Sequence, residues 1–209
     1  MGGLALVTLA GDHVRLEPLS RAHVPMLAAA AASGPRDTYA FTWVPATEAD
    51  AATYVDEALK LHAAGKALPF ATLDAATGRV VGSTRYVNTE FSTWPVGNPL
   101  QRGEELPDVL EIGATWLAPA AQRTPINTEA KLLMLTHTFE VWRVHRVSFM
   151  TDARNMRSRQ AILRLGATFD GVIRAARVAV AGGIRDTAAF SIVESEWPAV
   201  KAGLQAKLR

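Results

Sequence analysis

The feature that most constrains the fold is a central stretch, residues 111–140, in which a strand leads through a loop of small and polar residues into a helix. The strand is expected from Leu110 to Leu117. Thr124 followed by Pro125 predicts a helix N-cap and first helical position, because the missing proline amide costs little there. The helix is expected to bury an apolar stripe of Ile126, Ala130, Leu133, Leu135, Phe139 and Trp142.

A strand that leads directly into a helix start gathers free backbone N–H groups and the positive end of the helix dipole at one point. Such a point suits a pyrophosphate. An ordinary strand–loop–helix unit without a ligand fits the same pattern, so this stretch alone leaves both interpretations open.

Composition narrows the class of protein. The chain has 209 residues, of which 49% are apolar and 20% charged, which predicts one globular domain over residues 1–209. It has no cysteine, which excludes disulfides, a thiolate nucleophile and cysteine-ligated metal. Its histidines show no metal-ligand spacing, so no metal is expected. They are His13, His23, His62, His137 and His145.

The net charge and the first residues of the chain bear on the kind of ligand and on the cellular compartment. The net charge of +2 comes from interspersed charges of both signs, which weakly favours an anionic ligand and gives no reason to expect nucleic acid. The start lacks a basic segment, and its apolar run is too short for a signal or a membrane span. A cytoplasmic protein with no membrane partner is therefore expected.

Periodicity and turn residues place further elements on both sides of the central stretch. Before it we expect a strand at 14–19, helices at 21–32 and 48–64, and strands at 68–73 and 79–87. After it we expect a strand at 146–151, a helix at 155–165, a hairpin of 171–180 with 186–193, and a closing helix at 196–208.

The segment from Asn88 to Asp108 has no periodicity and is rich in proline and glycine. A loop of that length is typical of a lid or a binding loop, and we expect it to form one wall of an acceptor site. An arm that packs on another subunit fits equally well, since Trp94 offers a large apolar surface for either role. Trp43 and Trp116 could also line the acceptor cleft, although core packing is the simpler interpretation of Trp116.

Three motifs match one family. Leu117-Ala118-Pro119 and then Gln122-Arg123-Thr124-Pro125-Ile126-Asn127 lie over a pyrophosphate-loop pattern of Val/Leu-x-Pro and Gln/Arg-x-x-Gly-x-Gly/Ala. Asn155-Met156-Arg157-Ser158 with Leu165-Gly166-Ala167 matches Asn-x-x-Ser/Ala and Leu-Gly-Phe. The third motif is a tail of Arg185-Asp186, Phe190-Ser191-Ile192 and Glu196-Trp197-Pro198.

On these motifs the chain resembles the GNAT superfamily of N-acetyltransferases, and its tail is similar to the ribosomal-protein (RimJ/RimL-like) branch. The resemblance implies an α/β fold with a mixed, mostly antiparallel sheet that is splayed at its centre and flanked by helices. Acetyl-CoA would lie in the split between the central strand and the strand at 146–151. It also implies a monomer or homodimer.

The resemblance assigns a set of residues to acetyl-CoA binding. They are Leu117, Gln122, Arg123, Thr124, Pro125, Ile126, Asn127, Thr128 and Asn155. Two of them depart from the pattern, because Pro125 stands where glycine is usual and Asn127 where glycine or alanine is usual. Proline removes one N–H donor. The remaining donors are then expected to be the amides of Gln122, Arg123, Thr124, Asn127 and Thr128.

Two residues are the candidates for catalysis. Glu111 lies on the strand that, by resemblance, lines the acyl site, and could take the proton of the amine; a strand glutamate paired with an arginine is the structural alternative. Many relatives use a tyrosine seven residues after the helix asparagine, but Ile162 stands there. Ser158 could hydrogen-bond the departing thiolate, or only pack in its helix. Asn155 could hold CoA, cap the helix, or do both.

The function implied is direct transfer of an acetyl group from acetyl-CoA to a primary amine, such as a protein N-terminal α-amine, without a covalent enzyme intermediate. A small-molecule acceptor, either a polyamine or an aminoglycoside, is the alternative within enzymes. A non-catalytic acyl-CoA-binding protein is the alternative from another class, since the tyrosine is missing and the loop departs from its pattern.

Overall fold

The computed structural model describes residues 4–103 and 105–208. Its strands run along the chain as β1 (Leu9–Ala10), β2 (Val14–Pro18), β3 (Ala67–Asp74), β4 (Val80–Glu90), β5 (Val109–Leu117), β6 (Arg146–Asp152), β7 (Thr168–Val178) and β8 (Ile184–Val193). Its main helices are α1 (Val24–Ala32), α2 (Glu48–Ala63), α3 (Pro125–Thr136), α4 (Met156–Leu165) and α5 (Trp197–Ala206). Short turns of helix are η1 (Arg21–His23), η2 (Arg36–Tyr39), η3 (Pro119–Ala121), η4 (His137–Trp142) and η5 (Glu194–Glu196).

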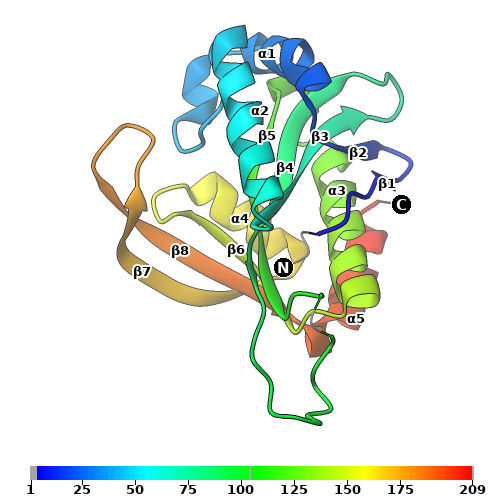
Figure 1. The fold of residues 1–209 in the computed structure, drawn as a ribbon. Coiled ribbons are helices and arrows are strands. Elements are labelled where there is room, and N and C mark those ends of the chain that lie inside the picture. The colour runs from blue at the N-terminus through cyan, green and yellow to red at the C-terminus, as the bar shows by residue number, and fades with distance from the viewer. Residues whose placement is uncertain (1–3, 104, 209) are drawn as a thin grey trace.

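The described strands form one mixed sheet of eight in the order β1-β2-β3-β4-β5-β6-β8-β7. Neighbouring strands run antiparallel except β5 and β6, which are parallel. The sheet opens between these two strands, so that β6, β8 and β7 swing away from β5 (Figure 1). The expected α/β fold with a central splay is confirmed, although the short strand β1 was not expected.

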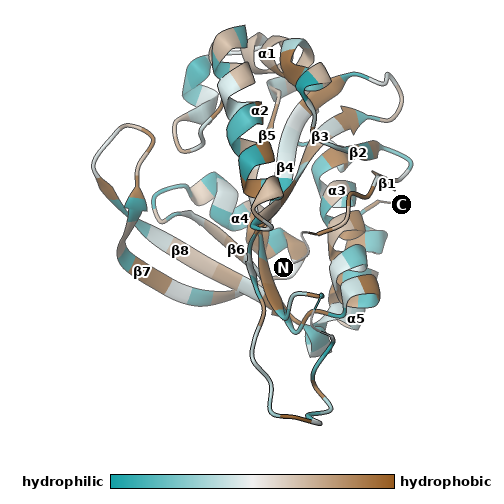
Figure 2. Ribbon diagram, viewed as in Figure 1, coloured by the Kyte–Doolittle hydropathy of each residue, from teal (hydrophilic) through white to brown (hydrophobic). Residues whose placement is uncertain are grey.

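Apolar residues pack in two clusters, one on each face of the sheet. The larger cluster lies under α3 and α5 and includes Phe70, Tyr86 and Phe190. The smaller lies under α1 and α2 and includes Leu27, Val55 and Trp116. Figure 2 shows the helices striped, with hydrophilic residues on their outer sides. No helix in the described ranges is long and apolar enough to cross a membrane.

Helix α3 begins as expected and ends differently. Thr124 has extended backbone and its hydroxyl accepts the amide of Ile126, so it is the N-cap before Pro125. The buried stripe contains Met134 where Leu133 was expected, since Leu133 is only half-buried. The helix then widens into the π-helical turn η4, which was not expected and which keeps Phe139 and Trp142 in the core.

The expected 88–108 loop is shorter than the sequence pattern suggested, because β4 continues through Glu90. The described chain after β4, residues 91–103 and 105–108, then projects away from the sheet (Figure 1). Trp94 donates its indole N–H to Asp108 at 2.8 Å and packs on His145, with ring centroids 5.5 Å apart. Val96, near the tip, is fully exposed. The loop is therefore anchored on its own chain at Trp94.

Candidate active site

The split in the sheet begins at a defined residue pair. β5 and β6 pair only from Val109 opposite Arg146 to Glu111 opposite Ser148, and then separate. Beyond this point β5 carries a bulge at Ala114, which has a positive φ of 48° and lies opposite Thr84 of β4. Bulges bend and twist a strand and re-aim its side chains. Glu111 thus stands where the two halves of the sheet part.

The carboxylate of Glu111 is buried, with 3% of the residue exposed. Its Oε2 accepts a hydrogen bond from Asn88 Nδ2 at 2.7 Å and one from Arg177 at 3.1 Å. Gly113, two residues along the strand, leaves room for this side chain, because a Cβ there would lie 2.8 Å from Glu111 Oε1. Both the catalytic and the arginine-paired interpretations of Glu111 are compatible with this geometry.

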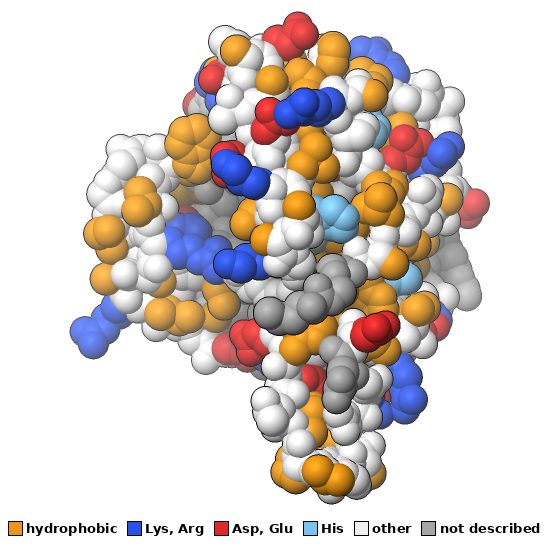
Figure 3. All heavy atoms as spheres, in the orientation of Figure 1, with side chains coloured by type: hydrophobic (Ala, Val, Ile, Leu, Met, Phe, Trp, Pro, Cys, Tyr) orange, Lys and Arg blue, Asp and Glu red, His pale blue; other side chains and the backbone are white. Residues whose placement is uncertain are grey.

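A polar pocket of about 380 Å³ surrounds Glu111 at the split. Its lining residues are Asn88, Thr89, Glu90, Glu111, Arg146, Ser148 and Met150. The end of β4, which the sequence placed at the start of the long loop, thus contributes to this pocket, whereas Trp94 is absent from its walls. Figure 3 shows Lys and Arg side chains beside the hollow between the β7–β8 hairpin and the rest of the molecule.

The start of α3 offers fewer free amides than expected. The amide of Gln122 donates to the carbonyl of Pro119 at 3.1 Å, and helix geometry gives the amide of Thr128 to the carbonyl of Thr124. Both are therefore corrected as donors, because local backbone structure already uses them. The amides of Arg123, Thr124 and Asn127 remain as candidate pyrophosphate donors. Arg123 is exposed and has a positive φ of 62°.

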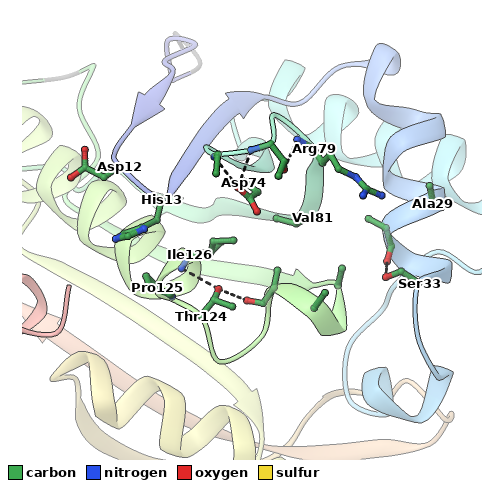
Figure 4. Close-up of a pocket in the computed structure, with 16 residues that line it drawn as sticks. Asp12, His13, Ala29, Ser33, Asp74, Arg79, Val81, Thr124, Pro125 and Ile126 are labelled. Atoms are coloured by element: carbon green, nitrogen blue, oxygen red, sulfur yellow. Dashed lines mark hydrogen bonds between the residues drawn. The ribbon is translucent and has the colours of Figure 1, made fainter. Parts of the chain in front are cut away.

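A cavity of about 430 Å³ also borders the start of α3, lined by Thr124, Pro125 and Ile126 (Figure 4). Its other walls come from α1, β3, β4 and the turn before β2, and they carry the carboxylates of Asp12 and Asp74. None of the residues around Glu111 lines it. The smaller pocket therefore contains the candidate base Glu111, and the larger cavity does not.

Helix α4 begins beside the split. The side-chain oxygen of Asn155 accepts the amide of Ser158 at 3.1 Å, which makes Asn155 the N-cap of α4. Asn155 is buried and Ser158 is half-buried, and within the described chain neither Asn155 Nδ2 nor the Ser158 hydroxyl has a protein partner. Each can still bond a ligand. Ile162, in place of the family's tyrosine, is buried in the core.

The tryptophans divide between the core and the surface. Trp116 packs edge-on against Tyr39 in the smaller cluster, in agreement with the core interpretation. Trp43 is 76% exposed.

Tyr39, the ring that packs against Trp116, is a buried phenol. Burial raises the pKa of the Tyr39 phenol, although Arg36 and Arg157 oppose this shift.

Lys131 was not among the predicted site residues. Its ammonium nitrogen is buried under the bulge of β5 and donates to Thr84 at 2.9 Å and to Thr115 at 2.7 Å. Burial lowers the pKa of this lysine from 10.5 to about 7. The signal in the sequence was a lysine directly after Ala130 on the buried side of the helix.

Sequence reasoning also missed Asn88, Gly113 and Arg177. Arg177 reaches Glu111 from the β7–β8 hairpin, 66 residues away along the chain. A second bulge, with Ala175 at a φ of 50° and its amide bonded to Asp186, precedes Arg177 and re-aims it. No local pattern indicates such a pairing, whereas the glycine two residues after Glu111 was a signal that could have been read.

The sequence and the structure were compared with known families and solved structures. The family model for the acetyltransferase (GNAT) domain matches residues 13–168. A GCN5-related N-acetyltransferase from Brucella melitensis is 33% identical, with 100% of this chain and 88% of that chain covered and a TM-score of 0.81. RimJ of Mycobacterium smegmatis, solved with CoA-disulfide, is 20% identical, with 98% of this chain and 93% of that chain covered and a TM-score of 0.73, which shows the likeness of fold. No curated protein matches this chain.

Proposed function

The chain belongs to the GNAT family of acyl-CoA-dependent N-acetyltransferases, and from this premise we propose that it acetylates a protein N-terminal α-amine with Glu111 as the general base. Residues 1–209 act as one domain in this proposal. The observation that carries it is the buried carboxylate of Glu111 at the point where β5 and β6 separate.

Glu111 has the position and the chemistry for proton removal. An amine is protonated near neutral pH and must lose a proton before its nitrogen can attack a carbonyl carbon. The carboxylate faces a pocket, and within the described ranges Asn88 and Arg177 bond its Oε2 and leave Oε1 without a side-chain donor. Oε1 lies over Gly113 and is the oxygen best placed to accept the proton.

Acetyl-CoA supplies the thioester, from which the acetyl group passes to the amine while the thiolate leaves. The start of α3 suits its pyrophosphate, because the candidate amides of Arg123, Thr124 and Asn127 lie at the helix N-terminus, where the helix dipole is positive. The cationic side chain of Arg123 is exposed next to them. Asn155, with a free Nδ2 at the start of α4, is proposed to hold the CoA arm.

Ser158 is proposed to stabilise the leaving sulfur. Its hydroxyl lies one turn into α4 and has no protein partner among the described residues. A serine is too weak an acid to protonate a thiolate efficiently, so it donates a hydrogen bond or relays a proton through water. Attack by the amine is direct in this proposal. The pocket's two hydroxyls, of Thr89 and Ser148, donate to the backbone carbonyls of Gly65 and Leu110 and not to a base that would activate them as nucleophiles.

The acceptor enters from the pocket side in this proposal, where Glu90 and Glu111 favour a cation. The 91–108 loop is proposed to form one wall, because it continues directly from Asn88 to Glu90 of β4, which line the pocket. A protein N-terminus is supported by the RimJ/RimL-like tail motif, and a small amine is the alternative that the experiment below separates.

The experiment is mass spectrometry of the host proteome with and without the gene product, read at N-termini and at lysines. New acetylation confined to a set of N-terminal α-amines is the expected result. Unchanged N-termini, together with acetyl-CoA consumption by a polyamine or aminoglycoside, would overturn the protein acceptor and leave the transferase activity standing.

A further inference from the structure

A buried arginine on the same sheet face as Glu111 has no counter-ion among the described residues. Arg85 on β4 is 7% exposed, and its Nε has no hydrogen-bond partner within the described ranges. Its guanidinium carbon lies 4.8 Å from the centre of the Tyr54 ring on α2. Stacking on a ring leaves the buried Nε–H without an acceptor, and a buried cation without an ion-pair partner is costly.

Arg85 and Glu111 lie on the same face of the sheet. Arg85 is the register partner of Gly113, and Val87 is the partner of Glu111, so the two side chains occupy adjacent rows. Glu111 Oε1 leans over Gly113, which has no side chain to fill the space beside Arg85. No ion pair joins Arg85 to Glu111 in the described structure, whereas Arg177 does pair with this carboxylate.

A second buried donor on this face also lacks an acceptor. Trp116, the register partner of Ser83, has a buried indole N–H with no partner among the described residues. Ser83 and Arg85 point to the same side of β4, toward Tyr54. Buried donors are normally bonded, so two unbonded donors on one face indicate that a ligand brings the acceptors.

We propose that Arg85, assisted by Trp116, binds a carboxylate of the substrate on the α2 side of the split, next to Glu111. A carboxylate matches a guanidinium because its two oxygens accept two parallel N–H bonds. This site rests on the proposed function and adds a substrate class to it. The carboxylate belongs either to the acyl group of the donor or to the amine acceptor close to its nitrogen.

The experiment has two arms, one that varies the acyl donor and one that varies the amine acceptor. The donor arm compares succinyl-CoA with butyryl-CoA, whose acyl chain has a similar length and no carboxylate. Calorimetry without acceptor is expected to give about tenfold tighter binding of succinyl-CoA, since charge-assisted hydrogen bonds are of that size. Arg85→Met should abolish the preference, and Arg85→Lys should retain part of it. This arm needs no turnover.

The acceptor arm supplies acetyl-CoA and a pool of primary amines, namely amino acids, their amides, and tripeptides varied at all positions. Mass spectrometry of the products is expected to show enrichment of carboxylate-bearing acceptors by about tenfold or more in the wild-type enzyme and no enrichment in Arg85→Met. Preference in either arm supports the proposal and identifies the source of the carboxylate.

Two controls test whether the effect is specific to Arg85. Arg102 also has a buried Nε without a partner among the described residues, but it pairs with Glu194, beyond the end of the sheet where β5 and β6 are still paired, so Arg102→Met should change neither preference. Arg85→Met should leave the melting temperature of the free protein unchanged or raise it, because it removes an unpaired buried charge.

Two results would overturn the proposal. One is a selectivity that Arg85→Met leaves unchanged in both arms, and the other is a lower melting temperature of Arg85→Met. Failure to consume acetyl-CoA with any amine would instead contradict the proposed function, and the calorimetric arm would still decide the role of Arg85.

Discussion

Arg177 of β7 and Glu111 of β5 form an ion pair across the split, with a guanidinium nitrogen 3.1 Å from Glu111 Oε2. The two strands lie at different places in the sheet, with β6 and β8 between them. The pair therefore ties the β7–β8 hairpin to the central strand. Among the described residues, the buried carboxylate of Glu111 accepts side-chain hydrogen bonds from two donors, Arg177 and Asn88.

The first prediction concerns this pair. Arg177→Met should lower the free energy of unfolding by about 1–2 kcal/mol, because it leaves the buried Glu111 carboxylate short of a charged partner; the partial exposure of Arg177 reduces the cost. In a Glu111→Gln background the same change should cost much less. Denaturant unfolding of the two single variants and the double variant measures this coupling. Additive effects would contradict a functional contact between the two side chains.

The second prediction concerns Gly113. Gly113→Ala places a methyl group 2.8 Å from Glu111 Oε1, so the carboxylate must move. We expect kcat to fall by about tenfold or more, since displacing a general base removes much of its contribution. Gly203→Ala on α5 is the matched control, because a Cβ there meets nothing within 4 Å. Equal activities of the two variants would show that the position of this carboxylate does not matter for turnover.

Local sequence patterns predicted those parts of the fold that depend on nearby residues. The N-cap at Thr124, the cap at Asn155 and the strands around Glu111 each follow from a few adjacent side chains. The extension of β4 to Glu90 and the π-helical turn η4 could not be predicted in this way, because pairing with β5 and core packing determine them. The partners of Glu111 and Arg85 depend on strand register and on a distant hairpin, which one sequence does not encode locally.

The third prediction is a pH dependence of stability from Lys131. Its pKa is about 7 in the folded protein and 10.5 ordinarily, so between these values unfolding takes up a proton. Stability should therefore rise with pH across this window, by up to about 1.4 kcal/mol per pH unit. Lys131→Met should show a flatter dependence over the same range. Unfolding curves for both proteins at matched pH values measure the difference, and parallel dependences would exclude a lowered pKa.

The fourth prediction concerns the start of α3. Arg123→Glu should weaken acetyl-CoA binding by at least about tenfold, because it places a negative charge beside the pyrophosphate. Arg143→Glu is the control, since Arg143 is likewise exposed with a positive φ, of 58°, but follows η4. Calorimetry with acetyl-CoA gives both affinities. An unchanged affinity in Arg123→Glu would remove this helix start from the binding site.

The role of Glu111 as base is the central claim, and CoA release from acetyl-CoA in the presence of an amine panel tests it most directly. Wild-type enzyme should turn over at least one amine, and Glu111→Gln should lower kcat by roughly 100-fold or more with little change in acetyl-CoA affinity. Glu90 is an exposed carboxylate in the same pocket, and Glu90→Gln should retain most of kcat. A loss of less than about threefold in Glu111→Gln between about pH 6 and pH 9 would contradict the account, as would acetyl-CoA binding without turnover of any amine.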